Sequence, residues 1–283
     1  MEIVRTVADL RKHIALWRKG EVRVGLVPTM GALHQGHMAL VEAARAECDR
    51  IVASIFVNPK QFAPTEDLGS YPRREAADLE MLRSAGVDLV FIPAVDEMYP
   101  PDFATLVRVS GLTEGLCGAH RAGHFDGVTT VVTKLLIQAL PDTAYFGEKD
   151  YQQLTVVRRL ARDLDLPVRS AGVPTVREPD GLALSSRNVY LSAEERRIAP
   201  NLARVLRSIA AVLAQDPNAV AQEIAHGSAA LQQAGFAVEY LEIREAESLA
   251  VTSEVTASSR VFAAVRLGTT RLIDNMPIAP AAP

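Results

Sequence analysis

Short runs of apolar and β-branched residues alternate with segments of helical periodicity over the first 175 residues. The runs lie at Val22–Val27, Ile51–Val57, Asp88–Ile92, Thr143–Phe146 and Val168–Ala171. Each run is apolar almost without interruption, which is typical of strands buried on both faces. Such strands in alternation with helices indicate a parallel sheet between two layers of helices. We therefore predict an α/β fold with a doubly wound parallel sheet for residues 1–175.

A different pattern begins near Val176. Ser192 and Glu195 form a capping box, which predicts the start of a long helix, and a second helix is expected over Ala219–Ala234, ending at Gly235. Strand-like stretches follow at Val238–Ile243, Arg260–Arg266 and Thr270–Asp274. Residues 176–283 are thus predicted to form a smaller α+β C-terminal domain that covers the site of the first domain.

Composition restricts the function classes. With 48% apolar and 23% charged residues, the chain has the composition of a soluble globular protein, and its net charge of −4 argues against a nucleic-acid coat. The first twenty residues read as a charged helix rather than a signal, and no apolar run approaches the ~20 residues of a membrane span. Cys48 and Cys117 show no metal-type spacing, and Ile278–Pro283 is expected to be a loose tail. We expect a cytoplasmic protein.

The segment PTMGALHQGH, residues 28–37, follows the first strong strand and precedes a helix. Gly31 and Gly36 allow the backbone to approach a nucleotide closely, and a helix N-terminus attracts phosphate. His34 and His37 can donate hydrogen bonds to phosphoryl oxygens and stabilise charge on a transferred phosphorus. Two alternatives remain: ordinary helix N-terminal residues, or metal ligands, for which no third ligand is evident nearby.

Two further segments offer polar groups. GEKDYQQ, residues 147–153, follows the strand at Thr143–Phe146, where open parallel sheets bind ligands. Lys149 suits a phosphate and Gln153 a polar substrate, although a solvated turn capped by Asp150 is equally compatible. The chain has no GxxxxGK[ST] sequence here, so this segment is no standard P-loop. Ser185, Ser186 and Arg187 lie in a loop at the start of the second domain and can donate to phosphate, or can belong to a hydrophilic linker.

Two quieter segments are FVNPKQF and HRAGHFDG. The first ends a strand, so Asn58 and Gln61 should face the carboxyl edge of the sheet. The second contains His120 and His124 with glycine between them, which favours a loop over a metal site, and both histidines stay unassigned.

PTMGALHQGH, FVNPKQF, GHFDGVTTVV, YFGEKDYQQL and LSSRN, in this order, resemble the pantoate–β-alanine ligase (pantothenate synthetase) family. That family belongs to the HxGH nucleotidyltransferase superfamily, which also includes class I aminoacyl-tRNA synthetases. The resemblance covers nearly the whole chain. It implies a Rossmann-like sheet and ATP-dependent condensation of (R)-pantoate with β-alanine through pantoyl adenylate, releasing AMP and pyrophosphate. It also implies Mg²⁺ held mainly through the phosphates and a homodimer, without nucleic-acid or membrane partners.

The resemblance assigns residues as well. His37, His34 and Lys149 would be catalytic, with His37 at the position of a proton donor. Gln61, Gln153 and Asn58 would bind pantoate or β-alanine, and Gln61 would face both. No protein ligand of a metal is implied. ATP would bind to Met30, Gly31, Ala32, Leu33, His34, Gln35, Gly36, His37, Gly147, Glu148, Lys149, Asp150, Val176, Leu184, Ser185, Ser186 and Arg187.

Two positions depart from the family pattern, since many members have Met at Leu184 and Pro at Ala122. Leucine conserves volume and apolarity, so ATP binding should survive; alanine relaxes the backbone beside Gly123. Two other functions stay open. One is an adenylyltransferase acting on a phosphorylated substrate, and the other is a non-catalytic nucleotide-binding or tRNA-associated module.

Overall fold

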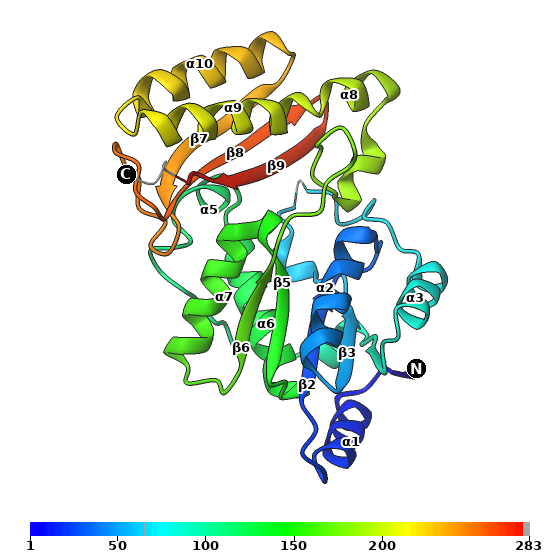
Figure 1. Ribbon diagram of the computed structural model, residues 1–283. Helices are drawn as coiled ribbons and strands as arrows, with labels where there is room; N and C mark the ends of the chain where they lie inside the picture. Colours follow the sequence, from blue (N-terminus) through cyan, green and yellow to red (C-terminus); the bar gives the residue numbers. More distant parts are fainter. Residues whose placement is uncertain (65, 280–283) are drawn as a thin grey trace.

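In the described part of the chain, six parallel strands form the larger sheet, in the order β1-β4-β3-β2-β5-β6. This computed structural model describes residues 1–64 and 66–279 (Figure 1). The strands are β1 Glu2–Val4, β2 Val24–Thr29, β3 Arg50–Ile55, β4 Leu89–Phe91, β5 Thr143–Gly147 and β6 Arg169–Val173. The predicted α/β class is confirmed.

Helices cover both faces of this sheet, because successive strand residues point to opposite sides. Val24 and Leu26 of β2 pack in one core cluster and Val27 in another. The first cluster contains residues of α1 Val7–Trp17, α6 His124–Ala139 and α7 Tyr151–Asp163. The second contains residues of α2 Gln35–Glu47 and α3 Glu75–Ser84. Two-sided burial explains why the strands read as continuous apolar runs.

The strand order places a switch point between β2 and β5. From β2, the chain builds β3 and β4 on one side and β5 and β6 on the other. β2 pairs with β3 as far as Thr29 with Ile55, but with β5 only at Gly25 and Leu26. The two strands therefore separate toward their carboxyl ends, at the position where doubly wound sheets bind ligands.

The smaller unit is an antiparallel sheet covered by two helices. Its strands, in the order β7-β8-β9, are β7 Ala237–Glu245, β8 Ser259–Leu267 and β9 Thr270–Pro277. Its helices α9 Asn201–Gln215 and α10 Val220–Gln233 pack on one face of the sheet. The other face lies toward the larger unit, with β9 above the carboxyl edge of the parallel sheet (Figure 1). The α+β pattern is confirmed, while the boundary at 175/176 stays a prediction.

Four local predictions require correction. The capping box at Ser192 exists, but the helix it starts, α8 Ala193–Ile198, stops before Pro200, which interrupts the helical hydrogen bonds; α9 begins anew at Asn201. The helix expected within the first twenty residues is present as α1, but the unpredicted strand β1 precedes it. Ile278 is no part of a loose tail, because it is 1% exposed and its N–H donates to Ser259 O. Residues 280–283 of that tail lie outside the described residues.

The fourth correction concerns the two histidines of HRAGHFDG. His120 ends a short helix, α5 Cys117–His120, and His124 begins α6, so only residues 121–123 form the expected loop. Gly123 adopts a φ of +76° there, a conformation that glycine takes without strain. The remaining helical segments are η1 Pro59–Gln61, α4 Val95–Met98, η2 Glu148–Asp150 and η3 Ser186–Tyr190. Among the described helices, none combines the length and apolarity required to cross a bilayer.

Candidate active site

A cavity opens where β2 and β5 separate, and the segment from Leu184 to Arg187 forms part of its wall. Residues from all four predicted ligand-binding segments line it. They are Met30, His34, Gly36, His37, Asn58, Gln61, Gly147, Lys149, Asp150, Gln153, Val176, Leu184, Ser185, Ser186 and Arg187. The strand-end positions inferred from sequence therefore converge on one site.

Five of the predicted residues do not line this cavity: Gly31, Ala32, Leu33, Gln35 and Glu148. The first three form the turn that leads from β2 to α2. Gln35 is exposed on the first turn of α2. The Glu148 carboxylate lies 3.6 Å from Arg260 of the smaller unit.

The turn after β2 is held by a buried carboxylate that sequence analysis missed. Gly31 and Ala32 both have positive φ, +78° and +51°. Asp78 of α3 is 2% exposed and accepts hydrogen bonds from Ala32 N–H, at 2.9 Å, and Leu33 N–H, at 2.8 Å. Left-handed conformation is unfavourable for alanine, so these contacts keep the turn in a strained form.

His34 and His37 cap the N-terminus of α2 with their side chains. His34 Nδ1 accepts from Gly36 N–H at 3.1 Å, and His37 Nδ1 accepts from His34 N–H at 3.2 Å. Each Nδ1 is therefore unprotonated, so the neutral ring carries its proton on Nε2. Burial lowers the pKa of His34 to about 4 and the pKa of His37 to about 3. Both rings are thus neutral Nε2–H donors at pH 7, so the capping interpretation is confirmed, and phosphate binding through Nε2–H stays a prediction that is compatible with it.

Lys149 supplies positive charge at the carboxyl end of β5. It lies in η2, directly after the strand, with its Nζ 3.8 Å from the Asp150 carboxylate. The Lys149 side chain is 19% exposed and lines the same cavity as the two histidines. Asp150 occupies the N-cap position of α7, as the turn alternative expected, but its side chain makes no capping hydrogen bond there.

Asn58 and Gln61 form a linked amide pair at the end of β3. Asn58 is 1% exposed: its Nδ2 donates to Gln61 Oε1 and Gly127 O, and its Oδ1 accepts from Tyr99 O–H at 2.8 Å. Gln61 Nε2 lies 2.8 Å from Met30 Sδ, a weak acceptor. Asn58 thus uses its hydrogen bonds within the protein and orients Gln61, which keeps donor capacity for a ligand.

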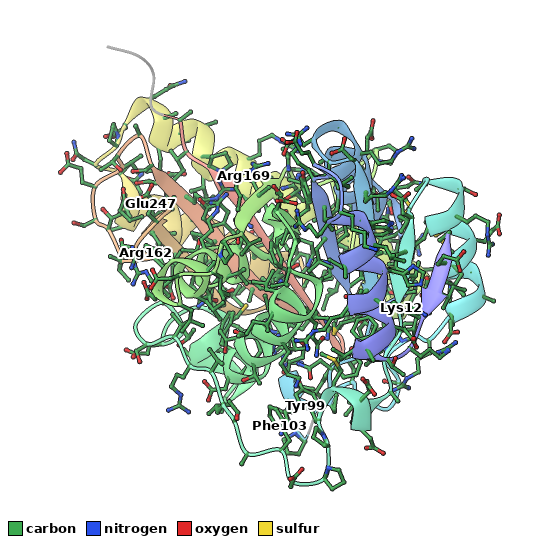
Figure 2. All side chains as sticks on the ribbon, turned by 90° about the horizontal axis from the view of Figure 1, so that it is seen from below. Lys12, Tyr99, Phe103, Arg162, Arg169 and Glu247 are labelled. Atoms are coloured by element: carbon green, nitrogen blue, oxygen red, sulfur yellow. The ribbon has the colours of Figure 1, made fainter. Side chains whose placement is uncertain are left out.

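Tyr99, which is 7% exposed, pairs with the aromatic ring of Phe103. Its ring centroid lies 5.0 Å from that of Phe103, and the two labelled side chains lie together at one edge of the molecule (Figure 2). The Tyr99 hydroxyl points inward from this pair to Asn58, and burial raises its pKa. The amide pair is therefore anchored by a buried hydroxyl of the aromatic pair.

Consecutive glutamines have different environments. Gln153 lines the cavity. Gln152 is 6% exposed, and its amide donates to Leu112 O and Gly115 O while accepting from Cys117 N–H. Helical geometry turns adjacent residues by about 100°, so only one of the two can face the ligand.

The serine-rich loop enters from the start of the smaller unit. Ser185 caps η3 by accepting from Arg187 N–H, and Ser186 Oγ lies 3.2 Å from Tyr71 O–H. Arg187 forms a bidentate pair with Asp67, at 2.9 and 3.0 Å. Tyr71 lines the cavity and is a site residue that no spacing in the sequence indicated.

Arg121 and His124 also line the cavity, whereas His120 faces a neighbouring groove beside Tyr240. Arg121 pairs with Glu66 at 2.6 Å, and one of its Nη atoms lies 2.8 Å from His124 Nε2. Burial, aided by Arg121, lowers the pKa of His124 to about 4. His124 is therefore a neutral ring that accepts from Arg121 and donates through Nδ1 to Gln61 O. Among the described residues, no three His, Cys, Asp or Glu side chains form a group suited to a metal ion.

Comparisons with known proteins point to one family along almost the whole chain. The family model described as pantoate-beta-alanine ligase matches residues 2–277. The pantothenate synthetase of Paramagnetospirillum magneticum is 56% identical over 281 residues, 99% of each chain, and that of Caulobacter vibrioides is also 56% identical over 281 residues, 98% of each chain.

Solved structures agree as well. The pantothenate synthetase of Thermus thermophilus matches with a TM-score of 0.94 at 52% identity, over 99% of this chain and 100% of that one. The Francisella tularensis pantoate-beta-alanine ligase, complexed with beta-gamma ATP and beta-alanine, matches with a TM-score of 0.81 at 32% identity, over 98% and 97%. With a family model and close relatives matched along almost its whole length, the chain belongs to the pantoate–β-alanine ligase family of enzymes.

Proposed function

We propose that this enzyme uses ATP to join (R)-pantoate to β-alanine, through an enzyme-bound pantoyl adenylate. The observation that carries the proposal is the meeting of two kinds of groups in one cavity. Phosphate-type donors come from His34, His37, Lys149 and the 185–187 loop, while amides come from Gln61 and Gln153. The Francisella relative complexed with beta-gamma ATP and beta-alanine supports ATP and β-alanine as ligands of this cavity.

In the first step, a carboxylate oxygen of pantoate forms a bond to the α-phosphorus of ATP, and the bond to pyrophosphate breaks. Positioning and stabilisation of phosphoryl charge are the main tasks of the protein here. Lys149 contributes a full positive charge, and the Nε2–H groups of His34 and His37 contribute neutral hydrogen bonds. The reaction requires no covalent enzyme nucleophile.

His37 acts in this proposal as a hydrogen-bond donor rather than as an acid that gives up a proton. Its Nδ1 already accepts from a backbone N–H, and protonation of that nitrogen would break the cap of α2. A pKa of about 3 leaves almost no imidazolium at neutral pH in the free enzyme. The resemblance puts His37 at the position of a proton donor. A neutral ring is better suited to stabilise phosphoryl charge by a hydrogen bond than to release a proton.

In the second step, the amine of β-alanine attacks the acyl carbon of the adenylate, and AMP leaves. In this proposal Gln61 contacts both pantoate and β-alanine. Its position between Met30 of the histidine-bearing turn and the Arg121–His124 pair supports this role. Gln153 and Gln61 would bind the hydroxyl and carboxylate oxygens of pantoate, and Asn58 would act by orienting Gln61.

Mg²⁺ and a homodimer complete the proposal. Mg²⁺ binds in phosphate sites through one or two carboxylates together with phosphate oxygens and water. The half-exposed Asp150 carboxylate beside Lys149 fits this donor set, and the ion would neutralise phosphate charge. The proposed homodimer rests on the family resemblance. Measurement of the molar mass in solution tests it, because a dimer has twice the 30.6 kDa of the single chain.

The decisive experiment is exchange of labelled pyrophosphate into ATP with Mg²⁺ and pantoate, in the absence of β-alanine. Exchange that depends on pantoate would establish both the adenylate and the first substrate. Formation of pantothenate on addition of β-alanine would establish the second. Exchange only with a phosphorylated substrate would overturn the proposal in favour of an adenylyltransferase.

A further inference from the structure

Asn275 of β9 connects the smaller unit to the loop that carries Lys149. Its side chain is 3% exposed, and its Nδ2 donates to Glu148 O at 2.8 Å and Lys149 O at 3.1 Å. Its Oδ1 accepts from Arg260 Nε at 3.0 Å and Nη2 at 2.7 Å. All hydrogen-bonding groups of this amide are thus used, two of them on the backbone of the Lys149 loop.

Arg260 of β8 reinforces the same connection. Its guanidinium lies 3.9 Å above the centroid of the Tyr151 ring and 3.6 Å from the Glu148 carboxylate. Tyr151 follows η2 directly in the chain. The smaller unit therefore holds the 147–151 segment by its backbone through Asn275 and by its side chains through Arg260.

The neighbouring Asp274 holds the second phosphate-type segment. It is 3% exposed and forms a bidentate pair with Arg177, at 2.6 and 2.9 Å. Arg177 donates in turn to Gly181 O and forms a β-bridge with Ala183. The segment that leads to Ser185–Arg187 is therefore fastened to the same strand, one residue away from Asn275.

We propose that Asp274 and Asn275 are positioning residues, which set the spacing between Lys149 and the 185–187 loop across the nucleotide. The inference rests on the proposed function, because it takes both segments as phosphate-binding. Lys149 and residues 185–187 lie outside the strands, whereas β9 is paired with β8 along its length. A paired strand supplies the rigid reference that two separate loops lack, and misplacement of a catalytic group by about 1 Å can cost about a hundredfold in rate.

A purely structural alternative gives Asn275 the task of satisfying two buried carbonyl groups. Both interpretations predict a loss of stability on mutation. They differ in kinetics, because positioning predicts a loss in adenylate formation that exceeds the loss shown by an equally destabilised enzyme. They also differ in where the effect is felt, because positioning predicts that the 147–151 segment in particular becomes more mobile on mutation.

Asn275→Asp is the informative variant. Aspartate keeps the acceptor for Arg260 but removes the donor, and it places an oxygen against the carbonyls of Glu148 and Lys149. The matched control is Val265→Ala, which removes two methyl groups from β8 on the side that faces α9 and α10, away from both loops. Thermal unfolding would establish that the two variants are comparably destabilised.

We expect Asn275→Asp to lower kcat/KM for ATP in pantoate-dependent pyrophosphate exchange by roughly ten- to a hundredfold. Val265→Ala should stay within about twofold of the parent enzyme. Arg177→Lys keeps the charge but loses the bidentate geometry, and should give a smaller loss of the same kind. Equal losses of kcat/KM in Asn275→Asp and Val265→Ala would overturn the proposal. Unchanged kcat/KM in both Asn275→Asp and Arg177→Lys would overturn it as well.

Amide hydrogen exchange separates this inference from the proposed function, because it requires no turnover. In Asn275→Asp, a peptide that covers residues 147–153 should exchange faster than in the parent, and the same peptide should be unaffected in Val265→Ala. Faster local exchange in an enzyme whose parent lacks pantoate-dependent activity would mean that the tie exists but the proposed reaction is wrong. Unchanged local exchange would refute the tie itself.

Discussion

Asp78 offers the sharpest test of how the fold prepares the proposed nucleotide site. The proposed perturbation is Asp78→Ala, which removes the acceptors of Ala32 N–H and Leu33 N–H. Each N–H left without a partner in a partly buried place costs about 1–3 kcal/mol, so the pair predicts a loss of about 2–6 kcal/mol. Ala32, with φ +51°, would then lose the contacts that keep it in a conformation costing about 1–2 kcal/mol.

Asp78→Ala should therefore lower stability and weaken ATP binding. Without Asp78 the turn should relax toward an extended or right-handed form, which moves the N-cap residue His34 and the Met30 backbone. We expect urea unfolding to show the stability loss, and KM for ATP to rise about tenfold or more, while KM for β-alanine changes less. Glu80→Ala on the same helix is the control, because its exposed pair with Arg83 contributes little.

A second substitution makes the reasoning refutable. Glycine adopts a positive φ without strain, so Ala32→Gly in the Asp78→Ala background should restore part of the ATP affinity. Unchanged KM for ATP in Asp78→Ala would show that the turn does not need the carboxylate. Failure of Ala32→Gly to restore any affinity would show that backbone strain is not what Asp78 opposes.

Other consequences can be measured independently. His37→Ala should lower pantoate-dependent pyrophosphate exchange by several orders of magnitude, on the order of 10³ for a lost charge-stabilising donor, with the far-UV circular dichroism unchanged; near-normal exchange would refute its role. Gln153→Ala should raise KM for pantoate far more than KM for ATP, whereas Gln152→Ala should mainly lower the unfolding temperature; equal effects of Gln153→Ala on both substrates would contradict the assignment. The pKa of His124, about 4 when folded against about 6.5 when unfolded, means that its contribution to stability is complete above pH 6.5 and declines as pH falls. The parent should lose about 3 kcal/mol more than His124→Gln between about pH 7.5 and pH 4, measured by urea unfolding, and parallel pH profiles would exclude this cause.

Much of the architecture was predictable because it follows from local periodicity. Continuous apolar runs identified five of the strands in the larger sheet, since strands buried on both faces have no polar alternation. The capping box at Ser192 and the stop at Gly235 were correct because their hydrogen bonds join residues close in sequence. The placement of ligand-binding segments at strand ends is a property of the fold class, which the alternation of strands and helices indicated.

Other features had no local signal. β1 has three residues, too few for a period, and it forms only because β4 offers an edge for parallel pairing. The expected long helix was divided by Pro200, and the predicted loop around His120 and His124 was shortened by helices at both ends. In each case packing or a single backbone constraint outweighed the average propensity of the segment.

The sequence was enough to place the histidine, lysine, amide and serine segments at strand ends and helix starts, because these features are encoded within a few neighbouring residues. How those residues are held depends on contacts between segments far apart in the chain. Asp78 acts on a turn 46 residues away, and Asn275 acts on a loop 126 residues away. Folding also determines the tautomer of His34 and His37. Backbone N–H donors occupy Nδ1 of each ring, and burial keeps both rings neutral, so that the proton lies on Nε2. These contacts and pKa values depend on the order of strands in the sheet and on burial. Neither can be inferred from the spacing of residues along the chain.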